Sequence, residues 1–246
     1  MTRIQHHDLR HSFEGVRVAI TGGTSGLGLA FVGELLQRGA QVAFVARDRD
    51  RVEQVAGRFN GTHGIVGDIA KKEDIHPIAL QIAGALGGLD VLINNASSLG
   101  PVPLALLGDT DCEDMELAFA TNVMGPFRLT KALLGALASS AREGSDAIVL
   151  NISSDAAINA YPGWGAYGAS KAALRHMSRI WDAELQAHHI RVLSIDPGDM
   201  DTPLHALAVP DADPAELKRP QDAARVLADA IGFALLRREQ IEGETT

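Results

Sequence analysis

The stretch Thr21-Gly22-Gly23-Thr24-Ser25-Gly26-Leu27-Gly28 follows directly on a short apolar run and opens a pattern typical of a helix. Glycines allow a tight turn that a ligand can approach closely, and the first N–H groups of a helix have no partner within it. These N–H groups and the positive end of the helix dipole favour a phosphate. A plain turn is the alternative, but a strand, a glycine-rich turn and a helix in this order favour a dinucleotide site.

The rest of the chain alternates short apolar runs with longer amphipathic stretches. Several runs are apolar almost throughout, as expected where helices cover both faces of a parallel sheet. We therefore expect an α/β fold with a doubly wound, Rossmann-type parallel sheet, whose ligands bind beyond the carboxyl ends of the strands. The expected strands span residues 16–20, 41–45, 64–66, 89–93, 147–152 and 191–195. The expected helices span residues 27–38, 50–59, 72–86, 113–141, 167–188 and 221–238.

The composition favours one domain. The chain has 246 residues, of which 46% are hydrophobic, and no repeat or linker-like stretch divides it. That length can bury a large single core. We expect a flexible leader over residues 1–14, one dinucleotide-binding and catalytic domain over 15–240, and a tail over 241–246.

Charge and hydropathy exclude several classes of partner. The formal net charge is −9 and no basic run is present, which argues against nucleic-acid binding. No apolar run approaches the roughly 20 residues that span a bilayer, and the leader lacks the apolar stretch of a signal peptide, so we expect a cytoplasmic protein.

The single cysteine, Cys112, cannot form an intrachain disulfide. His6, His7 and His11 allow metal binding in the leader, but a polar leader is the preferred interpretation, and no metal site is predicted.

The end of the second expected strand bears on the choice of dinucleotide. The chain has Ala46-Arg47-Asp48 there. Arg47 can form charge-assisted hydrogen bonds to a ribose 2′-phosphate, whereas an acidic residue would accept from both ribose hydroxyls and repel that phosphate. We expect NADP(H), bound through Arg47. The alternative is NAD(H), with Asp48 as the ribose ligand.

Two further strand ends supply polar candidates. Asp68 and Ile69 follow the third expected strand, where the carboxylate and the next backbone N–H can hold an adenine ring. An Asp that only caps the following helix is a serious competitor. Asn95 and Ala96 end the fourth strand, where small polar residues suit a backbone close to the cofactor.

The candidate catalytic residues are Tyr167, Lys171, Ser154 and Asn122. Tyr167 and Lys171 are four positions apart at the start of a helical pattern, so they share a face. A phenol with its usual pKa of about 10 is a poor base at neutral pH, and a nearby ammonium lowers that pKa. Ser154 ends the fifth strand, where its hydroxyl can hold a carbonyl oxygen. Asn122 lies inside a long helical pattern, where its poor helix propensity can bend the helix.

Together these motifs resemble the short-chain dehydrogenase/reductase family over about residues 14 to 235. That family has a Thr-Gly-x-x-x-Gly-x-Gly loop, matched here from residue 21 to residue 28, and an Asn-Asn-Ala-Gly element, matched by residues 94–97 with Ser97 in place of glycine. Its catalytic Asn, Ser, Tyr and Lys match Asn122, Ser154, Tyr167 and Lys171. Of two adjacent serines, Ser154 stands at the usual separation from the tyrosine. Residues 197–202 match the family's Pro-Gly-x-x-x-Thr turn, which contacts the nicotinamide.

The resemblance implies an oxidoreductase that moves a hydride between a nicotinamide and a carbonyl/alcohol pair, most simply a ketone or aldehyde reductase. Tyr167 would act as general acid/base, with the carbonyl oxygen also held by Ser154. Lys171 would lower the pKa of Tyr167, bind the ribose and pass protons from a water on the Asn122 backbone. The alternatives are an NAD-dependent alcohol dehydrogenase and a catalytically silent NADP-binding sensor or scaffold. The residues expected to bind the cofactor are Gly22, Thr24, Ser25, Gly26, Leu27, Gly28, Arg47, Asp68, Ile69, Asn95, Ala96, Tyr167, Lys171, Pro197, Gly198, Met200 and Thr202.

The sequence departs from the family in two places. Many NADP-using relatives have a second basic residue in the glycine-rich loop, where this chain has Ser25. The seventh strand of the family is missing, which favours a homodimer built from the helices that carry Asn122 and Tyr167.

The substrate is a small carbonyl compound or alcohol, with an apolar lining, a short lid and no obvious carboxylate clamp. The expected lining residues are Leu99, Ala156, Ile158, Tyr161, Trp164, Met200, Leu204 and Leu207.

Overall fold

Six parallel strands form a single sheet in the order β3-β2-β1-β4-β5-β6. The computed structural model describes residues 13–142 and 146–243, and these residues contain no seventh strand. This order is that of a doubly wound dinucleotide-binding sheet, so the expected fold class is confirmed. The strands are β1 (Arg17–Thr21), β2 (Gln41–Ala46), β3 (Thr62–Val66), β4 (Val91–Asn94), β5 (Ala147–Ile152) and β6 (Ile190–Ile195).

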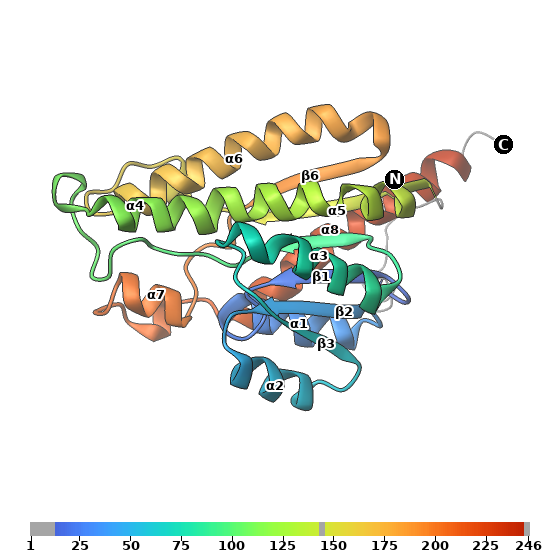
Figure 1. Cartoon of the computed structure of the whole chain (residues 1–246), viewed down its shortest axis with the longest axis horizontal. Coiled ribbons are helices and arrows are strands. Elements are labelled where there is room, and N and C mark those ends of the chain that lie inside the picture. Colours follow the sequence, from blue (N-terminus) through green and yellow to red (C-terminus); the bar gives the residue numbers. More distant parts are fainter. Residues whose placement is uncertain (1–12, 143–145, 244–246) are drawn as a thin grey trace.

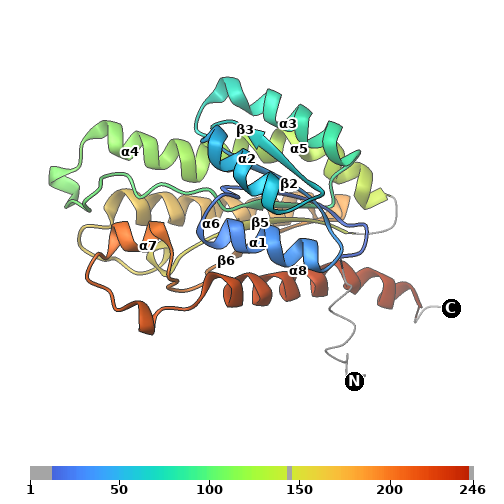
Figure 2. The same cartoon turned by 90° about the horizontal axis from the view of Figure 1, so that it is seen from below.

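Helices cover both faces of the sheet (Figures 1 and 2). On one face lie α1 (Gly26–Gln37), α2 (Arg49–Arg58) and α8 (Pro220–Gly243). On the other lie α3 (Lys72–Leu86), α5 (Gly125–Arg142) and α6 (Gly165–Leu185). The remaining helices are α4 (Cys112–Phe119), α7 (Pro203–Ala208), η2 (Leu107–Asp109), η3 (Ala120–Met124), η4 (Asp155–Ala157), η5 (Gln186–His188) and η6 (Pro214–Glu216).

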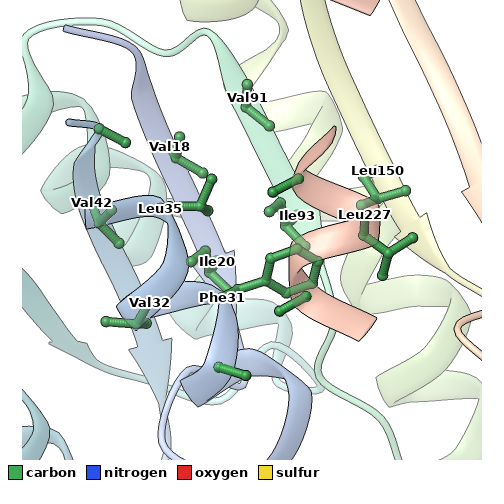
Figure 3. Close-up of a cluster of buried hydrophobic side chains, with 14 of the residues drawn as sticks. Val18, Ile20, Phe31, Val32, Leu35, Val42, Val91, Ile93, Leu150 and Leu227 are labelled. Atoms are coloured by element: carbon green, nitrogen blue, oxygen red, sulfur yellow. The ribbon is translucent and has the colours of Figure 1, made fainter. Parts of the chain in front are cut away.

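The alternation of side chains along β1 builds two cores. Val18 and Ile20 face α1 and α8, whereas Ala19 faces α3 and α5, because successive side chains of a strand point to opposite faces. Figure 3 shows Phe31 of α1 among side chains of the first core, close to Ile93 of β4. Burial of both faces explains why the strands are apolar almost throughout.

The long helix expected over residues 113–141 is interrupted. The structure divides it into α4, a π-helical turn η3, and α5, which follow one another as one continuous rod in Figure 1. The π-helical turn contains Asn122, the residue with poor helix propensity. Single π-turns often occur at functional sites, because the extra residue changes the direction of the neighbouring side chains.

Both ends of the domain differ from the expected boundaries. Phe13, expected in the leader, is fully buried in the core beside α1 and α8. At the other end α8 continues to Gly243, so residues 241–243 are helical rather than part of a tail. The leader histidines His6, His7 and His11 lie outside the described residues.

The short helix α7 was not expected as an element, because the sequence indicated only a short lid. In both views it lies at the same end of the molecule as α4 (Figures 1 and 2). Across the ranges 13–142 and 146–243, no helix is both long and apolar enough to cross a membrane.

Candidate active site

The glycine-rich loop lies where the strand order changes direction, between β1 and β4. The hydroxyl of Thr21 accepts hydrogen bonds from the backbone N–H groups of Asn95 (3.0 Å) and Ala96 (3.1 Å). The Asn95 amide in turn donates to the carbonyl oxygen of Thr21 (3.0 Å). These bonds tie the ends of two neighbouring strands together. They hold the loop rigidly at the position where a doubly wound sheet binds its ligands.

At two positions of this loop the neighbouring backbone lies so close that only glycine fits. A Cβ on Gly22 would lie 3.0 Å from the Cα of Ala96, and the φ of Gly22 is +72°. A Cβ on Gly28 would lie 2.1 Å from the carbonyl oxygen of Gly22. The helix α1 then begins at Gly26, and its N-cap residue Ser25 makes no side-chain cap. The first N–H groups of α1 are therefore not used by that side chain and fit a phosphate.

A cavity of about 480 Å³ extends along the carboxyl ends of the strands. Gly28 is the one predicted cofactor residue that does not line it, because it packs against the turn beneath. Asn122 does not line it either. The predicted cofactor and catalytic residues that do line it are Gly22, Thr24, Ser25, Gly26, Leu27, Arg47, Asp68, Ile69, Asn95, Ala96, Ser154, Tyr167, Lys171, Pro197, Gly198, Met200 and Thr202.

The basic end of the cavity contains Arg47 and a second arginine, Arg51. The carboxylate of Asp48 caps α2, accepting from the backbone N–H of Arg51 at 3.1 Å, and also lies 3.6 Å from the guanidinium of Arg51. Arg47 has no ion pair among the described residues. Arg51 is not among the residues expected from the sequence; Arg47 precedes α2 and Arg51 lies in its first turn, and the fold brings both to one cavity.

Asp68 lies between the cavity and α3, whose N-cap is Lys71 rather than Asp68. It lines the cavity, and its Oδ1 accepts from the backbone N–H of Ala70 at 3.0 Å. Its own backbone N–H donates to Asp74 at the start of α3. Asp68 therefore stabilises the turn before α3 while facing the cavity.

Tyr167 and Lys171 occupy the first two turns of α6 and are almost completely buried. The Lys171 ammonium donates to the carbonyl oxygen of Ile152 at 2.8 Å and lies 5.5 Å from the centroid of the Tyr167 ring. Burial lowers the pKa of Lys171 to about 8, and the nearby Asp196 opposes this shift. An ammonium at this place can move a proton near neutral pH.

Burial raises the pKa of Tyr167 to about 12, and hydrogen bonds with Ser154 and Ser97 oppose the shift. From the sequence, Lys171 is expected to lower this pKa. In the chain without ligand, loss of hydration is the largest effect. The Lys171 ammonium is bound to the Ile152 carbonyl oxygen instead of the phenol.

Ser97, noted in the sequence only as a departure from glycine, contributes to the site. Its hydroxyl hydrogen-bonds with Tyr167 and donates to the Oδ1 of Asn122 at 3.1 Å. Nothing local in the sequence indicated this role, because residue 97 follows β4 and Tyr167 begins α6. The two meet only when the sheet is assembled.

The side chain of Asn122 is fully buried and fully hydrogen-bonded. Its amide donates to the carbonyl oxygen of Ser98 (2.7 Å) and to the hydroxyl of Ser170 (2.8 Å), while its Oδ1 accepts from the Ser98 backbone N–H (2.8 Å). The side chain therefore joins the loop after β4 to α6. It acts on the arrangement of the cavity wall rather than on a ligand.

The other end of the cavity is formed by the loops after β5 and β6 and by α7. Of the expected lining residues, Ala156, Ile158 and Tyr161 do not line it; Ile158 and Tyr161 are exposed, and Ala156 packs behind Tyr167. The residues that line it as expected are Leu99, Trp164, Met200, Leu204 and Leu207.

The expectation of no carboxylate at this end is wrong. Asp155, Asp196 and Asp199 all line the cavity, and so does His205 of α7. They were missed because they come from three separate segments that converge only in the fold.

Comparison with known proteins agrees with this geometry. The profile of the short chain dehydrogenase family matches residues 17–213. Glucose 1-dehydrogenase of Gluconobacter oxydans is 32% identical over 90% of this chain and 85% of its own length. A short chain dehydrogenase structure from Shigella flexneri, complexed with NADP, has a TM-score of 0.82 and 26% identity over 89% of this chain and 92% of that one. A 3-ketoacyl-(acyl-carrier-protein) reductase from Brucella melitensis, complexed with NADH, has a TM-score of 0.81 and 28% identity over 87% of this chain and 90% of that one.

Proposed function

Because the chain belongs to the short-chain dehydrogenase family, whose members are oxidoreductases acting on CH–OH and C=O groups, we propose that it is an NADP(H)-dependent ketone or aldehyde reductase. The observation that carries the proposal is one cavity with two different ends. One end presents Arg47, Arg51 and the start of α1 to a phosphorylated dinucleotide. The other presents Tyr167 and Ser154 to a carbonyl oxygen.

The choice of NADP(H) is supported by the two side chains that follow β2. The Asp48 carboxylate is used as the cap of α2, whereas Arg47 remains available for a 2′-phosphate. The Shigella flexneri neighbour, complexed with NADP, supports the same choice. NAD(H) is the second candidate, because the Brucella melitensis neighbour is complexed with NADH.

The bound cofactor supplies the hydride. Tyr167 would donate its proton to the carbonyl oxygen, and the Ser154 hydroxyl, turned from Asp155 to the substrate, would donate to that oxygen and hold it in place. Lys171, buried and bound to the Ile152 carbonyl oxygen, would hold the cofactor ribose and pass to Tyr167 a proton that comes from water. Asn122 and Ser97 position the loop that forms the opposite wall. Oxidation of an alcohol follows the same path in reverse.

A homodimer through α4, α5 and α6 belongs to this proposal. Leu117 of α4, Met124 of the intervening η3 and Ile180 of α6 are large apolar side chains that are exposed. Phe127 of α5 and Trp181 of α6 lie against each other, with ring centroids 5.6 Å apart, so the helices pack side by side. Burying such residues against a second copy is favourable, because it removes apolar surface from water.

The test is NADPH oxidation against a panel of ketones, aldehydes and diketones, with wild type beside Tyr167→Phe. We expect turnover that falls by about 10²- to 10⁴-fold in the variant while NADPH still binds, since a positioned acid contributes rates of that order. Equal turnover in both proteins would contradict the assignment of Tyr167 as the general acid. NADPH binding with no turnover of any compound in either direction would favour a silent sensor.

A further inference from the structure

The substrate end of the cavity is negatively charged. The carboxylates of Asp155, Asp196 and Asp199 line it, and they come from the segments that follow β5 and β6. Hydrogen bonding from Tyr161 lowers the pKa of Asp155, so this carboxylate is ionised at neutral pH. Among the lining residues the one ammonium is that of Lys171, which interacts with Asp196, so three carboxylates stand against one ammonium at this end.

Asp155 lies two hydrogen bonds from the catalytic phenol. The Ser154 hydroxyl donates to its Oδ1 at 3.0 Å, and the same hydroxyl lies within hydrogen-bonding reach of the Tyr167 phenol. The Tyr161 hydroxyl donates to its Oδ2 at 2.7 Å and fixes the carboxylate from the outer side. A carbonyl oxygen held by Tyr167 and Ser154 therefore lies near Asp155, so a group that Asp155 binds belongs on a carbon close to the reacting one.

A second observation also points to a polar ligand at this end. Ser153 is 6% exposed and lines the cavity, yet its Oγ has no hydrogen-bond partner within the part of the chain that the structure describes. The Nδ1 of His205, another lining residue, is also buried without a partner there. Buried polar atoms are nearly always paired, so these two atoms indicate that a ligand with its own polar groups completes the site.

We propose that the substrate is an amino ketone or amino alcohol, with a protonated amine on the carbon next to the reacting one or one further along, and that Asp155 binds this ammonium. The proposal rests on the proposed function. Asp196 and Asp199 are exposed carboxylates of the same lining, and they add a solvent-screened negative potential that favours a cation over an anion. Leu99, Trp164 and Leu204 give the remainder of the substrate an apolar wall.

Three alcohols of nearly equal size test the charge selection. They are 2-amino-1-phenylethanol, which is protonated near neutral pH, the neutral 1-phenylethane-1,2-diol, and the anion mandelate. Their dissociation constants are measured by calorimetry on the free chain and on its complex with NADPH, in which an alcohol cannot react. Values of kcat/KM are measured with NADP⁺. We expect the amine to bind at least about tenfold more tightly than the diol, and mandelate to bind most weakly.

The variant Asp155→Asn keeps an acceptor for Ser154 and removes the charge. We expect it to reduce the preference for the amine over the diol to within about threefold. Asp211→Asn removes the same charge from an exposed position outside the cavity and should keep the full preference.

Two results would overturn the proposal: equal affinity of the wild type for amine and diol, or an equal loss for all three ligands in Asp155→Asn. The second result would make Asp155 a positioning residue for Ser154. Neither result contradicts the proposed reductase activity, provided that neutral ketones are still reduced and that this reduction depends on Tyr167. Conversely, selective binding of the amine without any turnover would support the selection of a cation by Asp155 and contradict the proposed reductase activity.

Discussion

The carboxylate of Asp48 accepts a hydrogen bond from the backbone N–H of Arg51 at 3.1 Å. This bond makes Asp48 the N-cap of α2, and Asp48 lines one cavity together with Arg47 before it and Arg51 on the helix. A carboxylate used as a cap is less available to a ribose hydroxyl, so the choice between the two dinucleotides depends on Arg47 and Arg51.

Replacing Arg47 with Ala should weaken NADPH binding by about 10- to 100-fold, because charge-assisted hydrogen bonds to the 2′-phosphate are lost. NADH, which lacks that phosphate, should lose less than about threefold. Fluorescence titration with each cofactor measures both values.

Arg49→Ala is the matched control for this variant. Arg49 starts the same helix but pairs with Glu53 at 4.0 Å and lies outside the cavity, so its removal should change neither affinity. Equal losses for NADPH and NADH in Arg47→Ala would contradict the cofactor assignment and favour NAD(H).

Lys171→Met should stabilise the chain without ligand while it abolishes activity. Burial lowers the pKa of Lys171 to about 8 in the folded chain, below the usual value of 10.5. The cost of folding around the ammonium is therefore fully present below pH 8 and disappears as the pH rises to 10.5. A shift of this size corresponds to about 3 kcal/mol, of which the lost bond to Ile152 offsets about 1 kcal/mol.

Urea denaturation at several pH values checks this expectation. The free energy of unfolding of Lys171→Met should exceed that of wild type by about 2 kcal/mol near neutral pH, and the difference should shrink above pH 8. Lys131→Met, at an exposed position of α5, serves as the control and should show no such pH dependence. A difference that stays constant over this range would mean that Lys171 is not the group responsible.

Gly28→Ala should destabilise the chain by about 3 kcal/mol and weaken NADPH binding, although Gly28 does not line the cavity. Its Cβ would lie 2.1 Å from the Gly22 carbonyl oxygen, so the phosphate-binding turn must move. Thermal denaturation and cofactor titration measure the two effects.

Gly33→Ala on the same helix is the matched control, because it adds the same methyl group where there is room for it. A Cβ there would meet only Phe59 at an ordinary 3.4 Å, and alanine is the better helix former, so a gain of about 0.5–1 kcal/mol is expected. Similar losses in both variants would point to a general effect on α1 and would contradict the steric argument.

The strands, the main helices and most of the residues that line the cavity could be predicted from the amino-acid sequence. Apolar runs of strand length separated by amphipathic stretches indicate a doubly wound sheet, because periodicity and burial are local properties of the chain. Tyr167 and Lys171 could be paired for the same reason, since four positions along a helix place two side chains on one face. The turn from Thr21 to Gly28 could be recognised because its glycines follow one another in the chain.

Only the tertiary structure decided which distant residues meet at the carboxyl edge of the sheet. Ser97 hydrogen-bonds with Tyr167, and Asp155 and Asp199 line one cavity, although each residue belongs to a different loop. The burial that raises the pKa of Tyr167 likewise depends on helices and loops far apart in the sequence. Spacing along one chain cannot encode such contacts, because parallel strands bring their ends together through crossovers whose packing is set by the whole core.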